Sequence, residues 1–198
     1  MKKLTAAVLT ALIIAGTVSA QSVIRIKGSD TLINLVQKLS EVYMENNPTT
    51  AIAVTGGGAG VGIASLISDR VEIANASRKM KPEEVESAKK NGVTPVEIII
   101  GIDGLSVIVN GDNPVDALTM QQIGAIFRGE ITNWKELGGR DKKISLYGRQ
   151  ANSGTFAFFQ KKVLGKKNYS KNMKRMNGNA QIVEGIAADS DGIGYVGI

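Results

Sequence analysis

The segment Gly148–Phe159, GRQANSGTFAFF, contains the residue types best suited to bind a small anion. Arg149 stands four residues before Ser153, Gly154 and Thr155, a run typical of a helix start. The first amides of a helix have no carbonyl partner, and the helix dipole makes that end positive. The two hydroxyls and the planar guanidinium would add donors around these amides, so the segment predicts a site for one oxyanion.

Three more segments combine glycine with hydroxyl or arginine residues at the predicted ends of strands, namely Gly28–Thr31, Gly56–Gly62 and Ala76–Arg78. A serine or threonine before a single helix is usually only a cap. Open α/β sheets, however, bind ligands at the carboxyl ends of their strands. Four such segments together therefore predict one shared anion site.

The glycine-rich run TGGGAGVGI at 55–63 also invites a nucleotide interpretation, which its spacing excludes. No lysine follows a glycine as a P-loop requires, and the third glycine of a dinucleotide fingerprint would fall at Val61 or Ile63. Two interpretations stay open for this run alone. One is a tight turn between strand and helix, and the other is a direct contact with the anion.

The formal charge of the chain is +6, from 24 basic and 18 acidic residues. Without Lys2 and Lys3, which lie in the predicted signal peptide, 22 basic residues and a charge of +4 remain. This mild excess favours an anionic ligand but falls short of the dense basic face of a nucleic-acid-binding protein. The basic tract 161–175 has one aromatic residue, Tyr169, and we interpret it as a solvated surface.

The sequence contains no cysteine and no histidine. Disulfides, thiolate metal sites and lipid attachment to a mature N-terminal cysteine are therefore excluded. The commonest general base, the usual zinc ligand and a Ser-His pair are absent as well. We expect no metal and no cofactor, and an enzymatic function loses most of its candidate residues.

Residues 1–20 have the features of a secretory signal peptide. Two lysines precede an apolar run at 4–18, and the sequence VSA at 18–20 offers the small residues that signal peptidase requires. The apolar run is short for a membrane span. We therefore expect cleavage after Ala20 and a soluble periplasmic product. A retained N-terminal anchor is the alternative.

Strand-like and helix-like segments alternate along the rest of the chain, which predicts an α/β fold. We expect strands at 23–26, 51–54, 71–74, 144–147 and 193–196, and helices at 32–43, 63–68, 82–90, 120–127, from 153 onward and at 179–188. The first of these helices has an apolar face from Leu32 to Tyr43. The β-branched run Val93–Val109 predicts one or two buried strands and a crossover between lobes.

Six motifs taken together resemble the periplasmic phosphate-binding proteins of high-affinity phosphate ABC transporters: GSDT (28–31), TGGGAGVGI (55–63), IANASRKM (73–80), IFRGEITNWKELGG (126–139), GRQANSGTFAFF (148–159) and GIGYVGI (192–198). The match covers essentially the whole mature chain. The resemblance implies a type II, two-lobed α/β fold in which each lobe is a sheet flanked by helices. Phosphate would lie in the cleft between the lobes, with no metal or covalent step.

The resemblance also implies a domain arrangement. Residues 21–103 would form the first part of lobe I, residues 104–190 lobe II, and residues 191–198 the start of a return to lobe I. We therefore expect a C-terminally truncated chain with an incomplete first lobe. Such a lobe would expose apolar sheet surface and an unpaired edge.

We expect phosphate to be bound by residues of all four segments: Ser29, Asp30, Thr31 and Leu32, Ala59, Ser77 and Arg78, and Arg149, Ser153, Gly154 and Thr155. Ala59 stands where many members of the family have a serine, so only its amide can donate. Arg78 stands where the best-known members have an aspartate, which accepts the proton of hydrogen phosphate and so rejects sulfate. Asp30 is our candidate for a substitute acceptor.

We predict a secreted, non-enzymatic and monomeric receptor that captures inorganic phosphate by lobe closure and delivers it to an inner-membrane ABC permease. Three alternatives stay open. The ligand is another tetrahedral oxyanion such as sulfate, molybdate or tungstate; the protein is a secreted phosphatase; or an adhesion or signalling protein reuses the fold.

Overall fold

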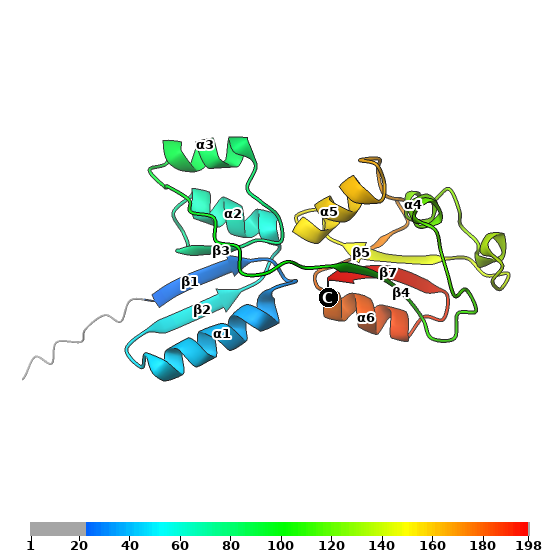
Figure 1. Ribbon diagram of the computed structural model, residues 1–198, viewed down its shortest axis with the longest axis horizontal. Helices are drawn as coiled ribbons and strands as arrows, with labels where there is room; N and C mark the ends of the chain where they lie inside the picture. The colour runs from blue at the N-terminus through cyan, green and yellow to red at the C-terminus, as the bar shows by residue number, and fades with distance from the viewer. Residues whose placement is uncertain (1–22, 198) are drawn as a thin grey trace, which may run out of the picture.

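The computed structural model describes residues 23–197, and the predicted signal peptide lies outside these residues. Two sheets are joined by a long connecting segment (Figure 1). The first sheet has the strand order β2-β1-β3 and consists of β1 (Val23–Gly28), β2 (Ala51–Thr55) and β3 (Ile73–Asn75). The second has the order β4-β7-β5-β6 and consists of β4 (Leu105–Val109), β5 (Ser145–Arg149), β6 (Lys174–Met176) and β7 (Gly192–Gly197).

Helices flank both sheets. The N-terminal lobe (residues 23–90) contains α1 (Ile33–Asn46), α2 (Ala59–Ile67) and α3 (Pro82–Lys90). The C-terminal lobe (residues 105–197) contains α4 (Met120–Arg128), a 3₁₀ helix (Trp134–Leu137), α5 (Gly154–Lys162) and α6 (Asn179–Ala187). Figure 1 shows α1 and α2 on opposite sides of the first sheet. The predicted two-lobed α/β fold, with a sheet flanked by helices in each lobe, is confirmed.

The carboxyl ends of the strands that lead into helices face the junction between the lobes (Figure 1). β1 is parallel to β2 and β3, with Ile26 between Val54 and Ile73. β5 is parallel to β6 and β7 and ends at Arg149, whereas β4 is antiparallel to β7. The loops that follow β1, β2, β3 and β5 consequently meet between the lobes.

Aromatic side chains form the core of the C-terminal lobe. Phe127, Phe159 and Tyr195 are buried, and the rings of Phe159 and Tyr195 stack with their centroids 4.0 Å apart. Trp134 is buried beside them and donates its indole N–H to the carbonyl of Asp191 at 3.0 Å. This core packs α4, α5 and β7 together and so holds the loop between β5 and α5 in place.

The connecting segment 93–104 does not form the buried strand predicted for it, and that prediction is wrong. Its large apolar side chains are exposed: Val96, Ile98, Ile99, Ile100 and Ile102. Only Leu105–Val109 of the predicted run is a strand, because it pairs with β7. A strand needs a neighbour for its amides and carbonyls, and the composition of a segment does not supply one.

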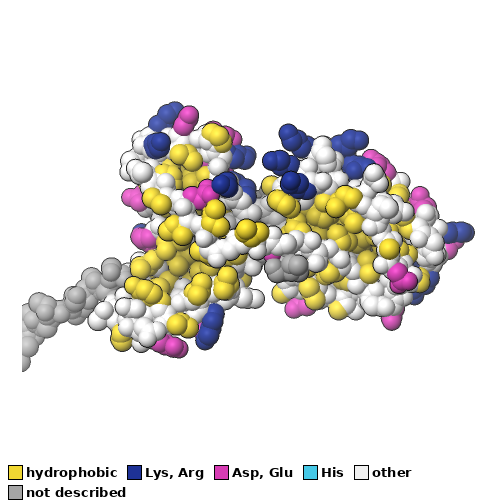
Figure 2. Space-filling view, viewed as in Figure 1, with side chains coloured by type: hydrophobic (Ala, Val, Ile, Leu, Met, Phe, Trp, Pro, Cys, Tyr) yellow, Lys and Arg dark blue, Asp and Glu magenta, His cyan; other side chains and the backbone are white. Residues whose placement is uncertain are grey.

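The helix predicted after the first strand is confirmed as α1, and most of its apolar face is exposed. The exposed residues of this face are Leu35, Leu39, Val42 and Tyr43. Val36 and Ser40 are the buried residues of α1, so the helix packs on the sheet through a narrow strip. The exposed apolar surface that was expected on the first lobe is therefore present, and Figure 2 shows part of it.

Three details differ from the sequence-based expectation or lie beyond it. α2 begins at Ala59 rather than Ile63, because Gly57 and Gly58 adopt positive φ and turn the chain early. β6 was not expected, because its three residues are mostly polar. The predicted residue limits of the two lobes stay predictions. Within residues 23–197, no helix is long and apolar enough to cross a membrane.

The close approach of α2 to β1 predicts the effect of one substitution. A Cβ atom on Gly62 would lie 2.7 Å from the Cα atom of Gly28, a rigid backbone atom. We expect Gly62→Ala to lower the free energy of unfolding by about 2 kcal/mol, although alanine favours helices. Gly111→Ala is the control, since nothing lies near its Cβ position. Urea unfolding measures both, and an unchanged or more stable Gly62→Ala protein would contradict the packing.

Candidate anion-binding site

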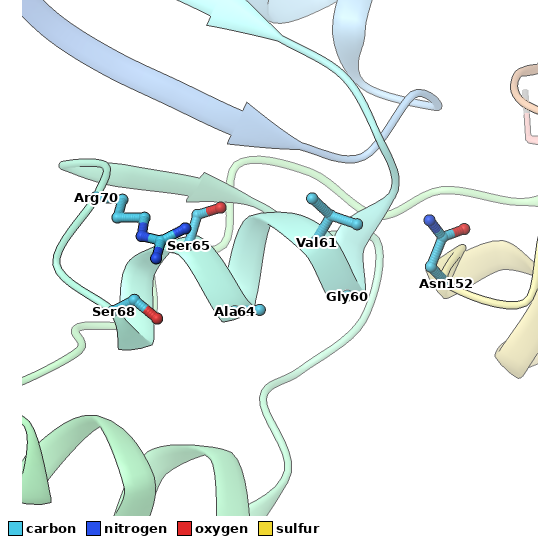
Figure 3. A pocket seen from close by; sticks show the side chains of 7 residues that line it. All are labelled: Gly60, Val61, Ala64, Ser65, Ser68, Arg70 and Asn152. Atoms are coloured by element: carbon cyan, nitrogen blue, oxygen red, sulfur yellow. The ribbon is translucent and has the colours of Figure 1, made fainter.

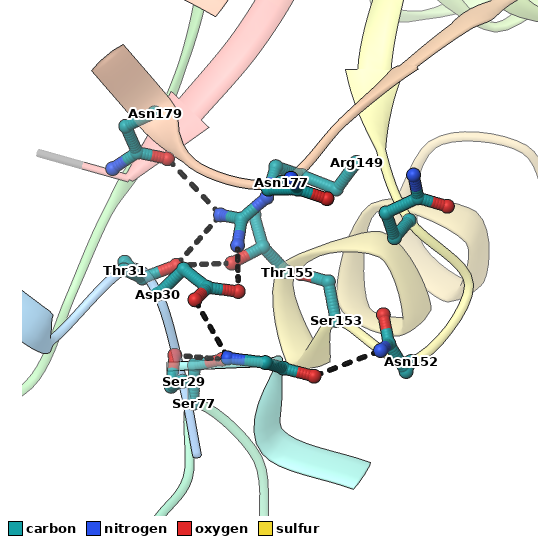
Figure 4. Close-up of polar contacts among 12 residues, drawn as sticks. Ser29, Asp30, Thr31, Ser77, Arg149, Asn152, Ser153, Thr155, Asn177 and Asn179 are labelled. Carbon is teal, nitrogen blue, oxygen red and sulfur yellow. Dashed lines mark hydrogen bonds and ion pairs between the residues drawn. The ribbon is translucent and has the colours of Figure 1, made fainter. Parts of the chain in front are cut away.

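The loops after β1, β3 and β5 bring polar side chains of both lobes together (Figure 4). The N-terminal lobe contributes Ser29, Asp30, Thr31 and Ser77, and the C-terminal lobe contributes Arg149, Ser153 and Thr155. Ser29, Arg149, Ser153 and Thr155 are buried although they are polar. The structure therefore places most of the predicted site residues in one buried polar cluster at the junction of the lobes.

Arg149 is the centre of this cluster and is completely buried. Its Nη1 atom donates to Thr31 Oγ1 at 2.9 Å and to Asn179 Oδ1 at 3.2 Å. Its Nη2 atom lies 3.6 Å from Asp30 Oδ2, an ion pair that is too long for a hydrogen bond. The Nε and Nη2 atoms have no hydrogen-bond acceptor in the described part of the chain. These two charged donor atoms of Arg149 are therefore available to an acceptor on a bound ligand.

Burial lowers the pKa of Arg149, and the negative charge of Asp30 opposes this shift. A buried guanidinium is unfavourable unless anionic groups and hydrogen bonds compensate for its lost hydration. Asp30 supplies one anionic group, and its Oδ1 atom in turn accepts from the amide of Gly57 at 2.8 Å. The carboxylate is therefore held in place from the N-terminal lobe while it faces the arginine.

Hydroxyl groups form further contacts in the cluster. Thr31 Oγ1 and Thr155 Oγ1, from different lobes, are 3.0 Å apart, and within the N-terminal lobe the hydroxyl of Ser29 donates to that of Ser77 at 3.1 Å. Ser153 Oγ accepts from the amide of Phe156 at 3.3 Å and so caps α5. A hydroxyl rotates freely and can exchange one acceptor for another. Thr31 and Thr155 can therefore donate to an anion placed beside Arg149.

The start of α5 adds backbone donors. Ser153 caps the amide of Phe156, which leaves the first-turn amides of Gly154 and Thr155 without an intrahelical acceptor. Gly154 packs against Ser77, and a Cβ atom there would lie 2.9 Å from the Ser77 carbonyl carbon. A glycine at this position is what allows the helix end to approach the other lobe.

Two other predicted backbone donors have different surroundings. Ala59 is fully buried at the first position of α2, with its amide at the positive end of that helix. The amide of Leu32, in contrast, donates to the carbonyl of Ser29 at 3.2 Å within the turn. Ala59 is therefore the better placed of the two to donate to a ligand.

Arg78 is the one predicted site residue whose side chain is directed elsewhere. Its guanidinium donates to both carboxylate oxygens of Glu84, at 2.8 and 2.7 Å, and to the carbonyl of Lys79 at 2.9 Å. This hydrogen-bonded pair raises the pKa of Arg78 and lowers that of Glu84. The structure does not bring Arg78 into the polar cluster, because α3 supplies a bidentate partner within six residues.

Two asparagines that the sequence patterns do not predict contact the cluster. Asn179 accepts from Arg149, and its Nδ2 atom donates to the carbonyl of Gly197 at 3.0 Å. It starts α6 directly after β6, so a prediction of β6 would have revealed a further strand-to-helix junction. Asn152 lies in the β5–α5 loop and contacts the N-terminal lobe. Nothing in its sequence position distinguishes it from an ordinary turn residue.

Comparison with known proteins gives a consistent result. The PBP superfamily domain matches residues 15–198. The chain is 32% identical over 184 residues to the phosphate-binding protein PstS of Pseudomonas aeruginosa, an alignment that includes 86% of this chain and 57% of that protein. The chain therefore spans little more than half the length of this curated relative.

Two solved structures resemble the fold closely. One is a substrate-binding protein of Clostridium perfringens assigned to a phosphate ABC transporter, with bound phosphate. It is 33% identical to this chain and has a TM-score of 0.79. The match covers 89% of this chain and 71% of that one. The other is an ABC-type phosphate transport receptor of Vibrio cholerae, 30% identical with a TM-score of 0.66 and coverage of 89% and 72%.

The Arg78–Glu84 pair predicts how stability depends on pH. Because the pKa of Glu84 is lower in the folded protein, the pair stabilises the fold above the ordinary pKa of a glutamate. This stabilisation is lost as the pH falls through the folded-state pKa. We expect Glu84→Gln to melt at a lower temperature than the parent protein at pH 7, and the two melting temperatures to converge as the pH falls below the folded-state pKa of Glu84. A constant difference across this range would contradict the assignment.

Proposed function

The chain belongs to the PBP superfamily, within the family of phosphate-binding proteins of ABC transporters, and from this premise we propose that it captures inorganic phosphate between its two lobes. We further propose that it acts in the periplasm, as a monomer and without catalysis, and that it presents phosphate to an inner-membrane ABC permease. The relatives named above support the ligand. The predicted signal peptide supports the location.

The observation that carries the proposal is the buried guanidinium of Arg149 with two donor atoms that lack an acceptor in residues 23–197. A group of this kind is costly to bury, and a dianion beside it removes the cost by accepting charged hydrogen bonds. Phosphate has the size and the number of oxygens to accept from Arg149, the hydroxyls and the helix amides at the same time.

The donors available to phosphate come from both lobes. We infer that Thr31, Ser77 and the amide of Ala59 donate from the N-terminal lobe, and that Arg149, Thr155 and the amide of Gly154 donate from the C-terminal lobe. Several of these groups bind one another in the structure, as the pair of Thr31 and Thr155 does. A phosphate that replaces such contacts links the lobes through itself, so binding and lobe closure become one process.

Asp30 is the group we propose for selectivity. It is the carboxylate of the cluster nearest to Arg149, and its Oδ1 atom already accepts from Gly57. Its Oδ2 atom can accept the proton of hydrogen phosphate, which sulfate lacks at neutral pH. Sulfate has no proton to donate, so the negative charge of the Asp30 carboxylate repels it. Asp30 therefore favours phosphate over sulfate.

The first test compares two arginines by titration calorimetry with inorganic phosphate. We expect Arg149→Met to weaken phosphate binding about a hundredfold or more, because a buried charged donor is lost. Without phosphate, Arg149→Met should be less stable than the parent, since the substitution removes one partner of the Arg149–Asp30 ion pair and leaves the carboxylate without its countercharge. Arg78→Met is the control, and we expect its affinity to stay within about twofold of the parent while its stability falls.

The same titration distinguishes the alternative ligands and functions. Sulfate, molybdate and tungstate are titrated separately and in competition with phosphate. Tighter binding of one of them would replace phosphate as the ligand, and turnover of a generic phosphate ester with added divalent metals would indicate an enzyme instead.

A second test addresses selectivity. Asp30→Asn keeps a carbonyl oxygen for the amide of Gly57 but offers an N–H₂ group where the carboxylate accepted a proton. We expect weaker phosphate binding, stronger sulfate binding and a phosphate-to-sulfate preference reduced about tenfold or more. If both affinities stay at the parent values, Asp30 is not the acceptor.

A further inference from the structure

A second contact between the lobes lies beside the polar cluster and uses none of the proposed phosphate donors. Asn152, in the loop between β5 and α5, donates from Nδ2 to the carbonyl of Gly57 at 2.8 Å (Figure 4). Its own carbonyl accepts from the amide of Gly60, in the first turn of α2, at 2.9 Å. One residue of the C-terminal lobe thus binds the glycine loop of the N-terminal lobe, residues 56–60, at two points.

The glycine loop has the shape this contact needs. A Cβ atom on Gly58 would lie 3.0 Å from both the side-chain Cγ and the carbonyl oxygen of Asn152, and Gly58 has φ +86°. A Cβ atom on Gly60 would lie 3.2 Å from the same carbonyl oxygen. Side chains at these positions would push the lobes apart. The glycines of this loop therefore make room for Asn152, whether or not the loop also contacts an anion.

The contact is connected to the anion site through one residue, Gly57. The amide of Gly57 donates to Asp30, the carbonyl of Gly57 accepts from Asn152, and Asp30 pairs with Arg149. Arg149 and Asn152 belong to the same loop. The two lobes are therefore held by a closed ring of contacts, in which Asn152 binds the carbonyl of Gly57 and Asp30 accepts from the amide of the same residue.

The contact is also accessible from solvent. Asn152 is exposed, and it stands at the end of an open groove of about 370 Å³ that runs along α2 past Ala64 to Ser68 and Arg70 (Figure 3). Water can reach the two hydrogen bonds from this groove and take their place. Because water can replace the two Asn152 hydrogen bonds, they can break when the lobes open and form again when the lobes close.

We propose that Asn152 is a latch between the lobes, which favours the closed arrangement and sets how long a bound anion stays. The Thr31–Thr155 contact gives way when an anion takes its place, but the Asn152 contacts do not compete with the ligand. They persist in the closed, loaded protein and must break before the lobes open. The affinity of the site depends on the fraction of closed protein, so loss of the latch weakens binding.

The part of this inference that concerns anion release rests on the proposed function. We expect Asn152→Ala to weaken phosphate binding about twofold to tenfold, the effect of one lost hydrogen bond. The weaker binding should come from a faster dissociation rate, measured by stopped flow, while the association rate is equal to that of the parent or higher because more ligand-free molecules are open. Asn152→Asp keeps the size of the side chain but cannot donate to the carbonyl of Gly57, so it should dissociate at least as fast as Asn152→Ala. Asn172→Ala is the exposed control in the same lobe and should match the parent.

A measurement without ligand tests the latch independently. Small-angle scattering should give a larger radius of gyration for ligand-free Asn152→Ala and Asn152→Asp than for the parent and Asn172→Ala, because more molecules are open. Equal radii for all four proteins would overturn the latch. If the parent shows no heat of binding with phosphate, the proposed function fails, but the comparison of ligand-free radii still decides whether Asn152 holds the lobes together.

Discussion

The burial of one positive charge governs the architecture of this protein. Arg149 is completely enclosed, and its hydration has to be replaced by Asp30 and Thr31 from one lobe and by Asn179 from the other. A guanidinium that is left with unused donors is unfavourable in a protein interior. The chain retains this unfavourable arrangement, and an anion that binds there recovers free energy that a fully satisfied cluster would not offer.

The sheets bring the partners of this charge together. Parallel strands place their carboxyl ends on one edge, and the two lobes turn these edges toward each other. Asp30 lies two residues after β1 and Arg149 ends β5, so neither depends on a long flexible loop for its position. The aromatic core under α5 keeps the second of these junctions rigid. Precision at the site thus comes from the regular elements rather than from the loops between them.

Local patterns in the sequence predict the parts of the structure that local interactions determine. The strand-to-helix junctions at Thr31, Ser77 and Ser153 follow from glycine, hydroxyl and apolar spacing, and they carry most of the polar cluster. Such patterns do not reveal which partner a segment or a side chain has. Segment 93–104 has the composition of a strand but pairs with no strand in residues 23–197, and the Arg78 side chain binds Glu84 rather than joining the polar cluster. Asn179 was missed because β6 before it is short and polar.

The uneven burial of the two lobes has a consequence for their thermodynamics. Within residues 23–197, the C-terminal lobe has a contiguous aromatic core, whereas the N-terminal lobe leaves much of the apolar face of α1 in contact with solvent. Fewer buried contacts lower the cost of local opening, so we expect this part of the N-terminal lobe to open before the aromatic core does. An anion that takes donors from both lobes binds only when both are folded, so its binding free energy adds to the stability of each. The ligand of such a site is also a folding cofactor.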